Sequence, residues 1–166
     1  MPATRGVTLV ELTMVLALVA ILAGFAVPTF VGVLLDSRRT AAILSTLHAI
    51  NLARQLAATR GESMLLCASQ DARQCSRRTE WSGGLLVTNV SESLMRSLPM
   101  PVSAHSPSMR SNRGSISFEG GSGFATPATL TICDRRGSAA ARAIIISRSG
   151  RPRVSASDSS GGPLAC

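Results

Sequence analysis

The stretch Glu11-Leu-Thr-Met-Val-Leu-Ala-Leu-Val-Ala-Ile-Leu-Ala-Gly-Phe25 opens the most apolar part of the chain. From Leu12 to Leu35 there are 24 residues without a charged side chain. As a helix rising about 1.5 Å per residue, this segment is about 36 Å long, which exceeds a hydrocarbon core of about 30 Å. A secretory signal peptide has a shorter apolar region and small residues at its cleavage site, whereas Pro28 and Phe30 follow here. The sequence therefore predicts a membrane-spanning or anchoring helix.

Glu11 lies at the start of this apolar segment. A carboxylate at membrane depth costs on the order of 3 kcal/mol at the helix centre and less near the interface. One interpretation is a functional one, in which Glu11 meets a cationic partner such as a newly exposed amino terminus. In the other, Glu11 lies at the headgroup level and is stabilised there by the helix dipole. These physical arguments alone do not separate the two.

The composition argues against catalysis. All 17 basic residues are arginine, so lysine-dependent phosphate loops, Schiff bases and Ser-Lys nucleophiles are excluded. The two histidines, His48 and His105, have no evident partner, and Gly120-Gly-Ser-Gly-Phe124 departs from a Gly-x-Ser-x-Gly nucleophile motif at its last position. We predict no enzyme activity, no catalytic residue, no cofactor and no metal.

The remainder of the chain has the pattern of an α+β protein. Apolar residues recur every three or four positions from Ile43 to Leu56, which predicts that one helix continues from about Val7 to a stop near Arg60-Gly61. The segment from Arg96 to Asn112 contains three prolines and is predicted to be a loop. The Ser/Gly-rich tail at 156–164 is predicted to be mobile unless it is tied down. Short apolar or β-branched runs predict an antiparallel sheet packed on the helix, with strands at 63–68, 84–89, 115–118, 129–133 and 142–147.

Four cysteines, an even number, suggest two disulfide bridges if this part of the chain lies in an oxidising compartment. Three pairings are possible. Cys67 and Cys75 lie close in sequence around a polar loop, which leaves Cys133 and Cys166. The Cys67-x7-Cys75 spacing does not match a zinc site.

Positive charge is concentrated after the apolar segment. Leaving out Arg5, Glu11 and Asp36 reduces 17 basic and 9 acidic residues to 16 and 7, a formal net charge of +9 for residues 37–166. Such a charge suits either a polyanionic partner or simple solubility. The arginines gather at two expected turns, with Arg135 and Arg136 in one and Arg148, Arg151 and Arg153 in the other.

The amino-terminal sequence resembles that of a type IV prepilin. The matching pieces are a short leader ending at Gly6, then Val7-Thr-Leu-Val-Glu11, a long apolar helix and Pro28. The resemblance implies cleavage between Gly6 and Val7 by the prepilin peptidase and methylation of the Val7 amine, although Val7 replaces the usual phenylalanine. It also implies that Glu11 pairs with the amino terminus of a neighbouring pilin during filament assembly.

The rest of the chain resembles the head of FimT/GspH-type minor pilins. The pieces that carry this resemblance are Cys67, Cys75, Trp81-Ser-Gly-Gly84, Phe118, Leu130-Thr-Ile-Cys-Asp134, Ile144–Ser147 and Ser149-Gly-Arg-Pro-Arg153. Together the resemblances imply a leader at 1–6, a membrane and filament-core helix at 7–35, and a periplasmic amphipathic helix plus β-sheet head at 36–166. They also imply a single-pass inner-membrane protein that becomes part of an extracellular pilus.

Within that family a Gly-Arg-x-Arg motif is associated with DNA binding during natural transformation, and Gly150, Arg151 and Arg153 match it. The expected ligand is double-stranded DNA, bound through its phosphates independently of sequence, with Arg148, Arg135 and Arg136 contributing. Because Trp81, Phe118 and Phe124 are scattered in the sequence, stacking of bases on an aromatic side chain is not expected. The alternative is a structural minor pilin or pseudopilin that primes or caps a filament without binding DNA.

Overall fold

The computed structural model describes residue 6 and residues 8–89, 91, 94–98 and 106–166. The chain divides into two compact units, Met1–Ser37 and Arg38–Cys166. A helix, eight strands and one short 3-10 helix, Ser138–Ala140, make up the regular structure of these residues. The α+β class predicted from the sequence is confirmed.

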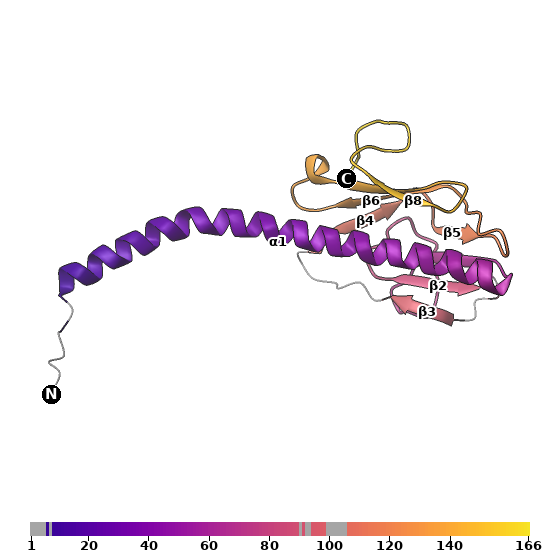
Figure 1. Cartoon of the computed structure of the whole chain (residues 1–166), viewed down its shortest axis with the longest axis horizontal. Coiled ribbons are helices and arrows are strands. Elements are labelled where there is room, and N and C mark those ends of the chain that lie inside the picture. Colours follow the sequence, from indigo (N-terminus) through magenta and orange to yellow (C-terminus); the bar gives the residue numbers. More distant parts are fainter. Residues whose placement is uncertain (1–5, 7, 90, 92–93, 99–105) are drawn as a thin grey trace. The chain divides into compact units, whose positions relative to one another are not determined.

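Helix α1 spans Leu9–Arg60 (Figure 1). Its first turn is capped by Thr8, whose Oγ1 accepts a hydrogen bond from the backbone N–H of Glu11 at 3.2 Å. The order Thr8-Leu-Val-Glu11 is that of a capping sequence, with an acidic residue in the first turn. The helix ends where Gly61 adopts a φ of 68°, a conformation that glycine tolerates best. Val7, the predicted first helical residue, lies outside the described residues.

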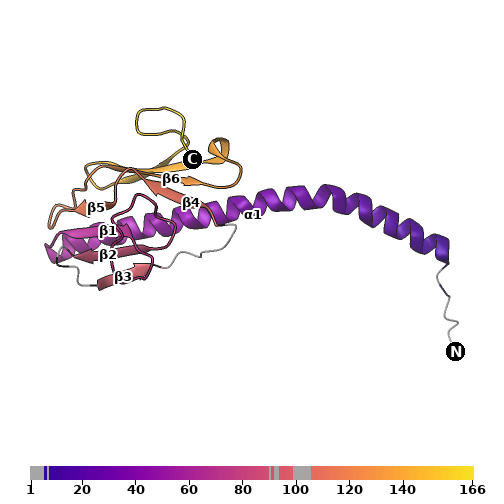
Figure 2. The same ribbon diagram turned by 180° about the vertical axis from the view of Figure 1, so that it is seen from behind.

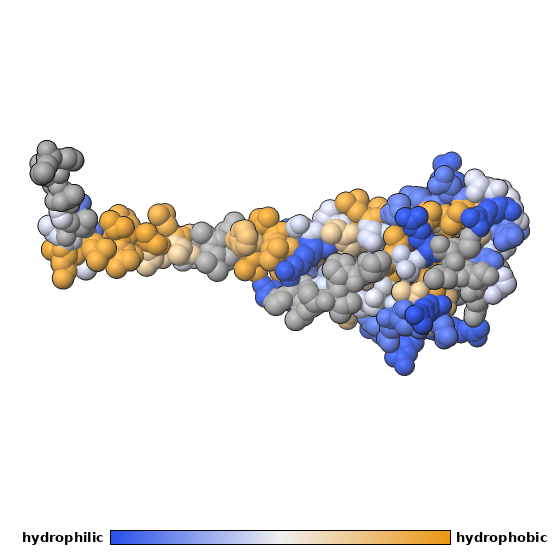
Figure 3. Space-filling view, turned by 90° about the horizontal axis from the view of Figure 1, so that it is seen from below, coloured by the Kyte–Doolittle hydropathy of each residue, from blue (hydrophilic) through white to orange (hydrophobic). Residues whose placement is uncertain are grey.

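In the first unit the apolar side chains of α1 from Leu9 to Phe25 are exposed, as the orange surface of its N-terminal part shows (Figure 3). Leu16, Leu22 and Phe25 are 59%, 67% and 75% exposed. This helix is long and apolar enough to cross a membrane, and it is the single helix among the described residues that meets these criteria.

In the second unit, α1 contributes one side of a hydrophobic core. The residues buried most completely are Ala49, Ile50, Ala53 and Ala57. Three of these four are alanines at intervals of four, so the backbone of the helix can approach the sheets closely. The larger residues of the predicted stripe, Ile43, Leu47 and Leu56, pack around this core and are partly buried.

The strands form two antiparallel sheets instead of the single sheet predicted (Figures 1 and 2). The first sheet has the order β3-β2-β1-β5, with β1 at Met64–Ala68, β2 at Leu85–Asn89, β3 at Leu94–Leu98 and β5 at Ser115–Phe118. The second has the order β4-β6-β7-β8, with β4 at Ser108–Ser111, β6 at Ala128–Cys133, β7 at Arg142–Ile146 and β8 at Pro152–Ser155. Both sheets contribute to the core that covers α1, together with the fully buried Trp81.

Five of the eight strands were predicted, and β3, β4 and β8 were not. The predicted loop between Arg96 and Asn112 is therefore wrong at both ends, and its middle, residues 99–105, lies outside the described residues. Strand β4 has only two buried residues, Met109 and Ser111, which is too short an alternation to recognise. Strand β8 begins with Pro152, a residue that a sheet accepts at the first position of an edge strand.

The C-terminal tail is attached to the second sheet. A disulfide joins Cys133 at the end of β6 to Cys166, and the other joins Cys67 to Cys75. The tail brings Leu164, 5% exposed, against Ala143 and Ile145 on the face of β7 that points away from the main core. Both faces of β7 are therefore buried.

Candidate nucleic-acid interface

The arginine-rich turn predicted from the sequence connects β7 to β8. It is closed by hydrogen bonds from the N–H of Ser147 to the carbonyl of Arg151 at 3.2 Å and from the N–H of Gly150 to the carbonyl of Ser147 at 2.9 Å. The Ser147 hydroxyl also donates to the Arg151 carbonyl at 3.2 Å. These contacts fix the backbone that carries Arg148 and Arg151.

Gly150 places this turn against the loop between β5 and β6. Its φ of 72° favours glycine, and a Cβ at this position would lie 2.5 Å from the carbonyl oxygen of Gly123. Nearby, the N–H of Ala125 donates to the carbonyl of Arg148 at 2.8 Å. Residues 123–125 therefore run beside residues 148–150, and the turn is supported by a neighbouring segment.

Arg148, Arg151 and Arg153 are exposed, and their guanidinium groups form no ion pair within the part of the chain that the structure describes. A fourth arginine, Arg54 of α1, lies behind the turn. The ideal Cβ position of Gly150 is 3.2 Å from Arg54 Cδ and 3.4 Å from Arg54 Nε. Arg54 could not be predicted from the sequence, because nearly a hundred residues separate it from the turn and no local pattern indicates that the two lie together.

Arg135 and Arg136 do not belong to this cluster. They lie in the connection between β6 and β7, at the other end of β7, and a five-residue strand separates the two turns by roughly 16 Å. Arg136 is engaged by Asp134, with 2.6 Å between Nη2 and Oδ2, and its hydrogen bonds lower the pKa of the Asp134 carboxyl. Arg39 of α1 also contacts Asp134 and the Ala140 carbonyl. Arg136 therefore closes its own turn, while Arg135 is exposed.

Phe124 lies beside the arginine-rich turn, so the expectation that no aromatic side chain accompanies these arginines is wrong. It is 52% exposed and shares with Arg148 the wall of a shallow depression of about 320 Å³. The sequence could not show that Phe124 and Arg148 lie near each other, since residues 123–125 approach the turn only in the folded chain. The depression is lined by Ser117, Glu119, Phe124, Ala125, Thr126, Pro127 and Arg148.

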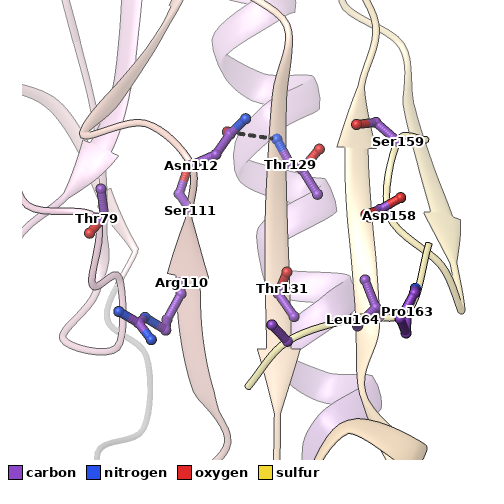
Figure 4. A pocket seen from close by; sticks show the side chains of 11 residues that line it. Thr79, Arg110, Ser111, Asn112, Thr129, Thr131, Asp158, Ser159, Pro163 and Leu164 are labelled. Atoms are coloured by element: carbon purple, nitrogen blue, oxygen red, sulfur yellow. Dashed lines mark hydrogen bonds between the residues drawn. The ribbon is translucent and has the colours of Figure 1, made fainter. Parts of the chain in front are cut away.

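A second cavity, of about 430 Å³, lies between the second sheet and the C-terminal tail (Figure 4). Two of its polar side chains are engaged: Asn112 Oδ1 accepts from the N–H of Thr129 at 2.9 Å, and Arg110 Nε lies 3.7 Å from Glu80 Oε2. Hydrogen bonds from the Ser160 hydroxyl and from backbone N–H groups hold the Asp158 carboxylate and lower its pKa. The described residues contain no cluster of ligands able to hold a metal ion.

The predicted assembly residues lie in the first unit. Gly6 and Glu11 are exposed, and Val7 is outside the described residues. Glu11 lies in the first turn of α1, where its N–H is capped by Thr8, so its carboxylate is placed at the positive end of the helix dipole.

A 52-residue N-terminal helix, apolar in its first part and packed in its second part on antiparallel sheets, is the architecture of a pilin-like subunit. Residues 42–150 match the family described as type II transport protein GspH, and the chain belongs to this family. The matched region ends at Gly150, before Arg151 and Arg153.

Solved structures give the same fold. The type IV minor pilin FimU of Pseudomonas aeruginosa (strain PAO1) superimposes with a TM-score of 0.54 at 22% identity, covering 80% of this chain and 94% of that one. A second crystal form of FimU gives a TM-score of 0.51 at 20% identity, covering 79% and 98%. A search of curated protein sequences gave no match.

Proposed function

We propose that this chain is a minor pilin whose head binds DNA through the β7–β8 turn and supports DNA uptake in natural transformation. The observation that carries this proposal is a set of three exposed arginines without ion pairs among the described residues. Arg148 and Arg151 lie on a turn whose backbone is fixed, and Arg153 lies in the adjoining strand β8. A fixed turn loses little conformational freedom when an anion binds. The guanidinium group suits the geometry of phosphate oxygens.

The binding expected of this site is electrostatic and independent of sequence. The three exposed arginines neutralise about three phosphates, and Arg54 adds a fourth if it also binds one. A plot of the logarithm of the binding constant against the logarithm of the salt concentration then has a slope of about −2.7 to −3.6 for duplex DNA. The surrounding charge of +9 over residues 37–166 favours approach of the polyanion at low salt.

The test is a titration of labelled duplex DNA with the full chain in non-ionic detergent, using Arg151→Gln combined with Arg153→Gln. We expect binding to weaken at least about tenfold and the salt slope to fall by about 1.8, because two phosphate contacts are lost. The melting temperature of the head should not change, since exposed side chains without ion pairs contribute little to stability.

Arg77→Gln combined with Arg78→Gln is the matched control, because both residues are exposed and the change in net charge is the same. This control should weaken binding no more than about twofold. An equal loss in the two double variants would show that net charge, and not the turn, binds DNA, and the assignment of the site would be wrong.

We also propose that the chain enters the filament as type IV pilins do. The prepilin peptidase cleaves between Gly6 and Val7, the new Val7 amine is methylated, and Glu11 pairs with this amine on a neighbouring pilin. The exposed Gly6 and the place of Glu11 in the first turn support this assignment. The chain is then a single-pass inner-membrane protein with a periplasmic head before assembly. Mass spectrometry of the chain from membranes should show loss of residues 1–6 and one added methyl group; retention of Met1–Gly6 would contradict it.

The second candidate function is that of a structural minor pilin or pseudopilin that primes or caps a filament, in a type IV pilus or in type II secretion, without DNA binding. It is favoured by the match to the family described as type II transport protein GspH, because the matched residues, 42–150, do not include Arg151 or Arg153. A deletion strain distinguishes the candidates, because loss of secretion with unchanged transformation supports the second and the converse supports the first.

A further inference from the structure

Phe124 is the one large aromatic side chain that lies exposed beside the arginines among the described residues. Its neighbours Gly123 and Ala125 are buried, so the ring is presented at the surface between two anchored positions. The carbonyl of Phe124 accepts from the N–H of Glu119 at 2.7 Å, and its own N–H donates to the Ser122 hydroxyl at 3.2 Å. The backbone that presents the ring is therefore held on both sides.

The same segment is bound to the basic turn. Ala125 donates to the carbonyl of Arg148, and the Gly123 carbonyl lies against Gly150. Phe124 and Arg148 consequently line one depression, which is open to solvent and large enough, at about 320 Å³, to admit a planar ring. An aromatic face next to an arginine without an ion pair is the combination that proteins use for single-stranded nucleic acids: a base stacks on the ring and a guanidinium binds the adjacent phosphate.

We propose that Phe124 is a stacking platform for an unpaired base, and that the site therefore binds single-stranded DNA or a frayed duplex end more tightly than an intact duplex. This inference rests on the proposed DNA binding by the turn and specifies its ligand. Bases inside a duplex are already stacked on both faces, so an intact duplex gains only the phosphate contacts.

The experiment compares the full chain, in non-ionic detergent, with oligothymidylate and with a duplex of equal length. Phe124→Ala should weaken binding of oligothymidylate about tenfold or more and leave duplex binding within about twofold, since only the single strand uses the ring. Val154→Ala is the matched control, because Val154 is a similarly exposed apolar residue, at 45%, and does not line the depression. This control should leave the binding of both ligands unchanged.

A second variant reports stacking directly. In Phe124→Trp, oligothymidylate should quench the fluorescence of the new indole. The fluorescence of the native Trp81 should not change, because this side chain is fully buried. Ala139→Trp, on the exposed 3-10 helix at the far end of β7, should show no quenching.

The outcomes separate this inference from the function on which it rests. Unchanged binding of oligothymidylate by Phe124→Ala, or equal weakening of both ligands, overturns the stacking role while duplex binding by the turn still stands. If Phe124→Ala reduces self-association of the chain and leaves DNA binding unchanged, Phe124 is a contact between subunits, and the stacking role is overturned. If the unaltered chain binds neither ligand at low salt, the proposed function itself is wrong.

Discussion

Replacing Gly150 with alanine is expected to destabilise the head by about 2–5 kcal/mol and to remove the arginine-rich turn from its position. A left-handed backbone conformation costs a residue with a Cβ about 1–2 kcal/mol. Overpacking adds about 1–3 kcal/mol, because the new methyl group would lie 2.5 Å from the Gly123 carbonyl oxygen, a backbone atom that cannot swing aside. Urea unfolding followed by the fluorescence of Trp81 measures the loss in free energy of unfolding, since Trp81 is the chain's single tryptophan and is fully buried.

Gly121→Ala separates the two contributions. Gly121 has a similar φ of 79°, but no atom lies within 4 Å of the position that its Cβ would take. This control should lose only about 1–2 kcal/mol, the conformational part. If the free energy of unfolding falls by the same amount in both variants, the close contact between the turn and the β5–β6 loop contributes nothing to stability, and this prediction is wrong.

The second large effect is expected for Cys166→Ser, which opens the disulfide that attaches the C-terminal tail. The bridge closes a loop with a sequence separation of 33, and the entropy of closing such a loop corresponds to about 4 kcal/mol. Without it Leu164 is free to leave Ala143 and Ile145, so one face of β7 becomes exposed. Urea unfolding should show the destabilisation, and hydrogen exchange should show faster exchange in β7.

Cys75→Ser is the control for this prediction. The Cys67–Cys75 bridge has a sequence separation of only 8, which corresponds to about 2.5 kcal/mol. A larger loss in Cys75→Ser than in Cys166→Ser would contradict the account given for the tail.

The sequence predicted the elements that carry strong periodic patterns. The helix and five strands were predicted because their apolar positions recur at regular intervals or form short continuous runs. Strands β3 and β4 were missed because they border the proline-containing segment that was predicted as a loop, and β8 was missed because it begins with proline. Pairing with a neighbouring strand defines all three. The division into two sheets also depends on these pairings.

The candidate site was predicted in part. The sequence indicated the turn with Arg148 and Arg151, because glycine and proline mark turns locally. It also assigned Arg135 and Arg136 to DNA binding, and the structure places these two at the opposite end of β7 from that turn. Successive hairpin connections of antiparallel strands lie at alternate ends of a sheet, so this separation follows from the order of the strands. Arg54 and Phe124 reach the turn only through tertiary packing, so no pattern within a window of sequence reveals them.

The place of Arg54 has a consequence for how this surface changes during evolution. Its aliphatic stem lies along the backbones of Gly123 and Gly150, which leaves its charge few alternative positions, while exposed arginines rotate freely in water. A lineage that loses its outer arginines one by one therefore keeps a fixed cation beneath the turn. Replacement of the outer arginines alone should then leave some attraction for anions at this surface, since the charge of Arg54 remains.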